Sequence, residues 1–239
     1  MIQVLLTNDV EEVSIVNNNL NPVIAKKVAR LGIPRILDLY SKYEVISTFY
    51  FTATFARRFP ETLIEVKERG HEIGCHGYSH LPKHAFDVLS PEMQFHHLYN
   101  SKKVIEHIVG KIESFRAPAL RINNYTLPIL SDLGFRTDSS IASKRFDGPL
   151  TFGSLKKINW LLSPSHPYNP SRRNPYRKGS LEILELPPSS RLLGFQGTTM
   201  RILPQVNKLL ASYLASFSRG TKSPIVFLFH PTEVVTEKF

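Results

Sequence analysis

The chain has one cysteine, no long apolar run and no dense basic tract, and each absence excludes a class of protein. A single cysteine, Cys75, excludes an internal disulfide framework and is typical of a reducing compartment. No stretch approaches the roughly 18 apolar residues that a membrane span needs, so no transmembrane segment is expected. The first residues lack the basic region and cleavage site of a secretory leader. Together these features predict a cytoplasmic protein.

The formal net charge of +10 favours anionic partners. The Lys and Arg residues are spread along the chain, with only short clusters, and no nucleic-acid-binding motif is present. We therefore expect acidic or phosphate-linked partners and no nucleic acid. The sequence gives no indication of the oligomeric state.

Strand patterns alternate with helix patterns along most of the 239 residues, which predicts an α/β fold with a parallel sheet. One long helix is marked at both ends, by Ser90 and Pro91 at its start and Gly110 at its stop. The expected strands are Ile2–Leu6, Thr48–Thr52, Glu72–Cys75, Phe135–Asp138, Leu181–Leu186 and Ile225–Phe229. No linker divides the chain, so residues 1–239 are expected to form one domain.

This alternation breaks over residues 142–180, which are rich in Pro, Ser, Asn, Arg and Tyr. Irregular segments of that length are uncommon in compact domains and often serve as lids or binding loops. We expect a long irregular insertion here.

Polar side chains stand where the expected strands end, and this regularity indicates an enzyme. The carboxyl ends of parallel strands meet at one rim, where catalytic groups gather. The residues in question are Asp9, His76, Arg116, Asp138 and His230.

Two histidines four residues apart, His76 and His80, lie on one face if the segment forms a helical turn, and they are then able to bind one ion. A competing pair, His80 and His84, requires a helical turn through Pro82, which disfavours it. A catalytic metal site needs a third ligand. Asp9 and Glu11 alternate along the first strand, so one is placed to bind metal and the other to handle protons.

Five motifs follow one another in the order found in a known family. They are Thr7-Asn8-Asp9-Val10-Glu11-Glu12, His76-Gly77-Tyr78-Ser79-His80, Phe115-Arg116-Ala117-Pro118, Leu133-Gly134-Phe135-Arg136-Thr137-Asp138-Ser139-Ser140 and Leu228-Phe229-His230-Pro231. In this order, over residues 7–231, they resemble the polysaccharide deacetylase family with the NodB homology domain (carbohydrate esterase family 4-like). The resemblance implies a distorted (β/α) barrel of about seven parallel strands, a divalent metal that is usually zinc, and hydrolysis of N-acetyl groups on sugars.

The resemblance also implies metal-binding roles for His76 and His80. The acidic motif resembles the Asp-x-Glu branch of the family rather than the commoner Thr-Phe-Asp-Asp-Gly form. That branch implies Asp9 as general base and Glu11 as third metal ligand, or these two roles exchanged.

The same resemblance assigns the remaining groups. Arg116 resembles the arginine that orients the catalytic aspartate, and His230 resembles the histidine that protonates the leaving amine. Asp138 resembles the partner that holds this histidine. The aromatic residue often found after the Arg-x-Pro motif is absent here.

The expected function is a metal-dependent hydrolase that removes N-acetyl groups from an N-acetylated sugar or cell-envelope glycan precursor. One alternative is an allantoinase-like C–N hydrolase acting on a small cyclic amide. Another is a catalytically inactive glycan-binding relative.

Overall fold

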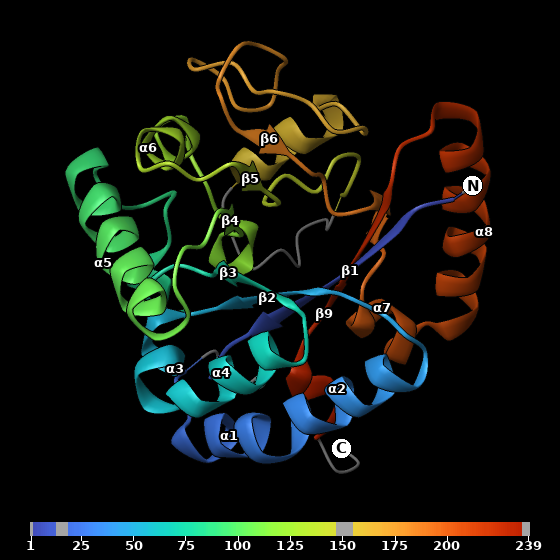
Figure 1. Ribbon diagram of the computed structural model, residues 1–239. Coiled ribbons are helices and arrows are strands. Elements are labelled where there is room, and N and C mark those ends of the chain that lie inside the picture. Colours follow the sequence, from blue (N-terminus) through green and yellow to red (C-terminus); the bar gives the residue numbers. More distant parts are fainter. Residues whose placement is uncertain (1, 13–18, 147–154, 236–239) are drawn as a thin grey trace.

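The computed structural model describes residues 2–12, 19–146 and 155–235, and its centre is one curved parallel sheet (Figure 1). Seven strands pair in the order β6-β5-β4-β3-β2-β1-β9, and every pair is parallel. The prediction of an α/β, distorted barrel of about seven parallel strands is confirmed. The strands are β1 (Val4–Val10), β2 (Thr48–Phe51), β3 (Glu72–Cys75), β4 (Ser114–Phe115), β5 (Thr137–Asp138), β6 (Leu184–Glu185) and β9 (Ile225–Phe229).

Apolar side chains on both faces of the sheet explain why these segments read as continuous hydrophobic runs. Strands of a parallel sheet are covered on both sides, and alternation between apolar and polar residues is therefore weak. Phe49, Phe51 and Phe115 are fully buried, and the single tryptophan, Trp160, is 1% exposed in the same core.

Helices lie around the outside of the sheet (Figure 1). The long helix α5 (Pro91–Val109) begins and ends where the sequence predicts. The Ser90 hydroxyl accepts the Met93 N–H at its start, and Gly110 takes a φ of 77° at its end. The other helices are α1 (Pro22–Lys27), α2 (Ile33–Lys42), α3 (Ala53–Arg58), α4 (Pro60–Glu68), α6 (Thr126–Asp132), α7 (Gly197–Ile202) and α8 (Pro204–Thr221).

The two edge strands of the sheet, β6 and β9, are covered by irregular chain. Tyr168 pairs with Glu185 on the outer edge of β6. Gln196 pairs with Leu228 on the outer edge of β9, just after a small hairpin of β7 (Ser190–Arg191) and β8 (Leu193–Gly194). Covered edges offer no free backbone groups for pairing with another chain.

The predicted insertion at 142–180 lies partly outside the described residues, at 147–154. Within the described part, Leu155–Leu162 forms a 3₁₀ helix. Asn169 then donates to the carbonyls of Leu181 and Ile183, which fixes this stretch along β6. The single-domain assignment stays a prediction.

Replacing Gly74 by Ala is expected to destabilise the sheet. A Cβ on this residue of β3 would lie 2.5 Å from the Tyr50 ring and 2.6 Å from the Ser114 hydroxyl. Overpacking of this kind costs about 1–3 kcal/mol, measurable by denaturant unfolding. Gly220→Ala is the matched control, because its Cβ meets open space near the end of α8. An unchanged unfolding midpoint for Gly74→Ala would contradict this packing.

Candidate active site

The carboxyl ends of the strands bring the predicted polar residues to one rim. Asp9 lies near the end of β1, and His76 and Arg116 directly follow β3 and β4. Asp138 ends β5, and His230 directly follows β9. Because these strands pair in parallel with the register Asn8↔Phe229 and Phe115↔Asp138, residues more than 200 positions apart become neighbours.

Glu11, His76 and His80 form the tightest group at this rim. Glu11 Oε2 lies 3.0 Å from His80 Nε2 and 3.6 Å from His76 Nε2. The three ligand atoms all lie within 4.8 Å of one another. Glu11 is 9% and His76 1% exposed, so the group is largely shielded from solvent.

The orientation of His76 is set by the backbone carbonyl of Arg116, which lies 2.8 Å from His76 Nδ1. A carbonyl oxygen only accepts hydrogen bonds, so Nδ1 carries a proton, and the neutral ring then has its lone pair on Nε2. A metal-binding histidine is usually oriented by a hydrogen bond of this kind. The lone pair of His76 Nε2 therefore faces Glu11.

The two imidazoles meet without the helical turn that we predicted, and that part of the prediction is wrong. Residues 76–80 form an irregular loop in which Gly77 has a φ of 70°. A positive φ at Gly77 reverses the chain and brings His80 back toward His76. His84 lies apart from this group, with its Nδ1 2.6 Å from the Ser79 hydroxyl.

The donor set suits a divalent cation. Glu11 Oε2 is a buried carboxylate oxygen without a hydrogen bond, and such groups usually have a partner. Two imidazole nitrogens and one carboxylate oxygen are the ligands of catalytic zinc, which keeps a fourth position open. In the part of the chain that the structure describes, this is the one such group of three His, Cys, Asp or Glu side chains.

Neighbouring charges act strongly on Glu11. Burial raises the pKa of this carboxyl, but the nearby His80, His76 and His230 outweigh burial and lower the pKa to about 2. The carboxylate is therefore held in its charged form, which is the form that binds a cation.

Arg116 is fully buried and holds Asp9 in place. Its Nη1 donates to Asp9 Oδ1 at 2.9 Å and to the Thr7 hydroxyl at 2.8 Å. Its Nε donates to the Ser139 carbonyl, and its guanidinium lies 4.5 Å from the Tyr50 ring centroid. The second oxygen of Asp9, Oδ2, is left facing His76 Nε2 at 3.9 Å.

The loop after Arg116 is strained. Ala119 and Leu120 have φ values of 51° and 55°, which non-glycine residues rarely adopt. Strain of this kind gathers at functional sites, where the surrounding structure maintains it. Ala119 and Leu120 stand where the family that the motifs resemble often has an aromatic residue.

His230 has a different carboxylate partner from the one that the resemblance implies. The side chain beside it is Glu233, with Oε2 3.8 Å from His230 Nδ1. Glu233 also accepts the His230 backbone N–H at 3.0 Å and the Thr198 hydroxyl at 2.7 Å. The sequence signal for it is a capping pattern, in which an acidic residue three positions along bonds back to the helix start.

Asp138 pairs instead with Glu185, a residue that the sequence did not suggest. The two face each other on adjacent strands, and both are fully buried. Asp138 accepts the Ser140 hydroxyl at 2.6 Å and Glu185 accepts the Ile141 N–H at 2.9 Å. Their remaining oxygens have no other hydrogen-bond partner. Two buried carboxyls this close share one proton, as like charges cannot both stay ionised there.

The fold and the rim define a class: a barrel-like α/β protein with acidic, imidazole and guanidinium groups at the carboxyl edge of a parallel sheet. A profile of the polysaccharide deacetylase family matches residues 28–137, a segment that contains His76, His80 and Arg116. Over this segment the chain is similar to the polysaccharide deacetylase family, and the resemblance that the sequence motifs indicate is confirmed.

Curated relatives match about half of the chain. A peptidoglycan deacetylase of Helicobacter pylori is 32% identical over 117 residues, which are 48% of this chain and 39% of the relative. A chitooligosaccharide deacetylase of Azorhizobium caulinodans is 24% identical over 128 residues, 52% of this chain and 60% of the relative. The match therefore spans less than two thirds of either relative.

Solved structures share the fold over nearly the whole chain. A candidate polysaccharide deacetylase from Mycobacterium smegmatis has a TM-score of 0.66 at 18% identity, covering 96% of this chain and 78% of that one. An allantoinase has a TM-score of 0.63 at 17% identity, covering 97% and 78%. At these identities the likeness shows the fold alone.

Replacing Glu233 by Gln is expected to lower the pKa of His230. Burial lowers that pKa, but the Glu233 hydrogen bond and the charges of Glu11 and Asp9 raise it to about 9. Without the Glu233 charge the pKa falls toward its usual value near 6.5. Histidine NMR titration of the metal-free protein measures this, with the other histidines as internal controls. An unchanged His230 titration would show that Glu233 does not hold the proton there.

Replacing Glu185 by Gln is expected to change how stability depends on pH. Burial raises the pKa of Glu185, so the folded protein keeps a proton that the unfolded chain releases above about pH 4.5. The native protein therefore loses stability as pH rises from 4.5 toward the raised pKa, and Gln removes this loss. Denaturant unfolding over a pH series measures it, with exposed Glu182→Gln as control. Parallel curves for native and Glu185→Gln proteins would exclude the shared proton.

Proposed function

We propose that the chain is a metal-dependent hydrolase that removes N-acetyl groups from an N-acetylated glycan. One observation carries this proposal: Glu11, His76 and His80 converge directly beside an aspartate that a buried arginine holds. An amide is a poor electrophile with a poor leaving group. Its hydrolysis needs an activated water, a base and an acid within reach of each other.

The names of the relatives support the substrate class. They are a peptidoglycan deacetylase and a chitooligosaccharide deacetylase, together with a peptidoglycan-N-acetylglucosamine deacetylase of Bacillus cereus. We infer a cell-envelope glycan or its precursor as the substrate. The net charge of +10 suits an anionic or phosphate-linked acceptor.

In this proposal Glu11, His76 and His80 hold a divalent cation, with zinc as the expected metal. When bound, such a cation polarises the acetyl carbonyl and lowers the pKa of water near it. Glu11 is the preferred carboxylate ligand because its oxygen lies closer to both imidazoles than that of Asp9 does.

Asp9 then serves as general base. Arg116 binds one of its oxygens, which leaves Oδ2 to take the proton of the attacking water. In the same proposal, a backbone N–H of the loop after Arg116 donates to the oxyanion.

His230 serves as general acid. Its Nε2 lies 4.0 Å from Glu11 Oε1, next to the proposed metal ligands. Glu233 favours the protonated form of this histidine. The imidazolium gives its proton to the sugar nitrogen, which leaves as an amine while acetate is released. Asp138 has an indirect role in this proposal. It accepts a hydrogen bond from Ser140 and interacts electrostatically with Arg116, which holds the base.

The alternative substrate, a small cyclic amide, needs an enclosed site. The Arg- and Tyr-bearing segment 166–178 runs along the outer edge of β6, and Arg172 pairs with Asp132 of α6 at 2.8 Å. This placement supports a site open to a glycan over one closed by a lid. The cytoplasmic location stays a prediction from the sequence. None of the described helices has the length and apolar character needed to cross a bilayer.

Replacing His76 or His80 by Ala is expected to abolish metal retention. Each change removes one of three ligands and leaves too few for a catalytic site. Metal content after dialysis, measured by mass spectrometry, tests this. His84→Ala is the matched control, since it removes a nearby imidazole outside the group. Full occupancy in either ligand variant would refute the ligand assignment.

Replacing Asp9 by Asn is expected to keep the metal but remove acetate release. The amide cannot take a proton from water, and loss of a general base typically costs about 10²–10⁴-fold in rate. Acetate is measured over a panel of N-acetylated saccharides, with zinc, cobalt or no metal added. Native activity in Asp9→Asn would exclude Asp9 as base, and metal-loaded protein inactive on every saccharide would favour the non-catalytic alternative. Ring opening of a cyclic amide without acetate release would favour the allantoinase-like alternative.

A further inference from the structure

One flank of the barrel exposes large apolar side chains from α7, α8 and the β7–β8 hairpin. We call this surface the flank face and define it by Leu192, Leu193, Ile202, Val206, Leu209 and Tyr213. Leu209 is 72% exposed, and Leu192 and Ile202 are each 64% exposed. Val206, Leu209 and Tyr213 follow the spacing that places side chains on one side of a helix.

The fold does not need this stripe for its core. Helix α8 already packs on the sheet through Leu210 and Leu214, which contact Ile225 of β9. Figure 1 shows α8 as an outer helix on one flank of the barrel. Helix α8 therefore carries more apolar residues than it buries against the sheet. Exposed apolar residues of this kind are typical of an interaction surface.

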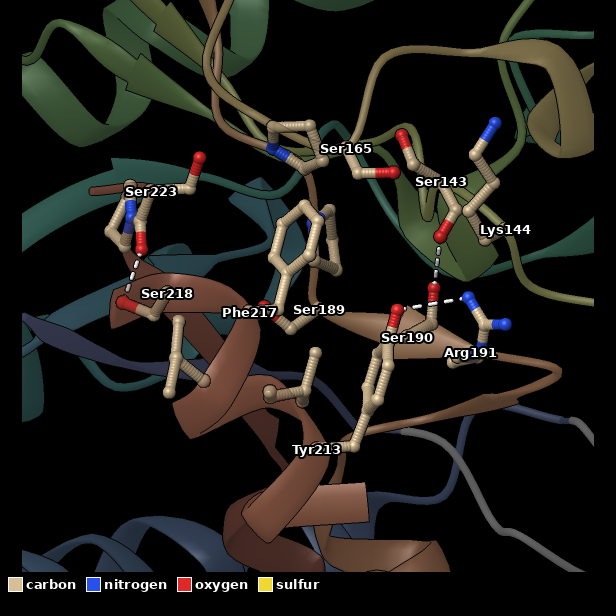
Figure 2. A pocket seen from close by; sticks show the side chains of 15 residues that line it. Ser143, Lys144, Ser165, Ser189, Ser190, Arg191, Tyr213, Phe217, Ser218 and Ser223 are labelled. Carbon is tan, nitrogen blue, oxygen red and sulfur yellow. Dashed lines mark hydrogen bonds between the residues drawn. The ribbon is translucent and has the colours of Figure 1, made fainter. Parts of the chain in front are cut away.

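A contact between Arg191 and Tyr213 links the hairpin to α8. Arg191 Nη1 donates to the Tyr213 hydroxyl at 2.9 Å, and its guanidinium lies 4.7 Å from the ring centroid (Figure 2). This contact places the hairpin tip beside the helix. Leu192 at the tip has a φ of 62°, a rare conformation for a leucine, and its side chain projects into solvent.

The same flank is rich in positive charge. Residues 186–232 contain no Asp or Glu. They contain five exposed cations, which are Arg191, Arg201, Lys208, Arg219 and Lys222. Exposed apolar side chains among cations, with no acidic residue in the segment, are typical of elements that lie in the interface of an anionic bilayer.

We propose that the flank face docks the protein on an anionic lipid bilayer, with the stripe and the hairpin tip in the interface. A second copy of the chain is a poorer occupant. A two-fold contact through this face would set the cations of both copies against each other, and the segment offers no carboxylate to offset them. The proposal is independent of the deacetylase activity, because no residue of the flank face belongs to the rim.

A small cavity of about 160 Å³ lies between the hairpin and α8 (Figure 2). Two of its hydroxyls already have partners: Ser190 donates to the Ser143 carbonyl, and Ser218 donates to the Ser223 carbonyl. We assign this cavity no ligand, so the docking inference rests on the outer surface alone.

Sedimentation with vesicles tests the proposal on the whole chain. The protein is expected to sediment with phosphatidylglycerol–phosphatidylcholine vesicles, less so as salt rises, and to stay in solution with pure phosphatidylcholine. Lys208→Glu is expected to weaken binding by about fivefold or more, and Leu209→Gln to weaken it similarly. The matched controls are Lys26→Glu and Ile46→Gln, which change an exposed lysine and an equally exposed isoleucine elsewhere.

Circular dichroism of each variant shows whether it is folded, so that a loss of vesicle binding is not mistaken for a loss of structure. Because neither the assay nor the variants involve the rim, the result does not depend on catalysis. Binding that is absent, equal on neutral vesicles, or unchanged in both flank variants would overturn the proposal. So would a dimer in analytical ultracentrifugation that Leu209→Gln dissociates, since the face would then belong to a second copy.

Discussion

The structure depends on one buried cation. Arg116 is fully buried, and its guanidinium contacts Thr7 and Asp9 of β1, the Tyr50 ring of β2 and Ser139 just after β5. An unpaired charge in this position would cost several kcal/mol, so the strand ends around it must stay in register. The contact that holds the strand ends together is also the contact that orients the proposed base.

The same residue orients the proposed metal ligands. The Arg116 carbonyl fixes the ring of His76, and that ring faces Glu11. Each charged group at the rim has a partner that offsets its charge. Arg116 neutralises Asp9, and Glu233 favours the protonated form of His230. In the Asp138–Glu185 pair, the shared proton removes one negative charge. The proposed base, acid and ligands thus lie a few ångströms apart in different charge environments, which is what amide hydrolysis needs.

Local patterns in the sequence were enough to predict the sheet, the ends of α5 and the positions of the rim residues, because each depends on neighbours in the chain. These patterns were not enough to predict the role of Glu185 or the carboxylate that lies beside His230. In the sequence, Glu185 is one of two glutamates in an otherwise apolar strand, and only the strand register shows that it lies opposite Asp138. The prediction of a helical turn over residues 76–80 was wrong for a related reason. A spacing of four suggested a helical turn, whereas the positive φ of Gly77 and its close packing against Phe86 and Pro118 set the actual path.

We propose that Glu11, His76 and His80 share one divalent cation, while Asp9 stays free to act as base. Anomalous diffraction at the zinc edge from crystals soaked with zinc tests it most directly. We expect a single strong peak about 2.0–2.2 Å from Glu11 Oε2 and from the Nε2 atoms of His76 and His80, with Asp9 still bound to Arg116. A peak elsewhere, or one in which Asp9 takes the place of Glu11, would contradict it.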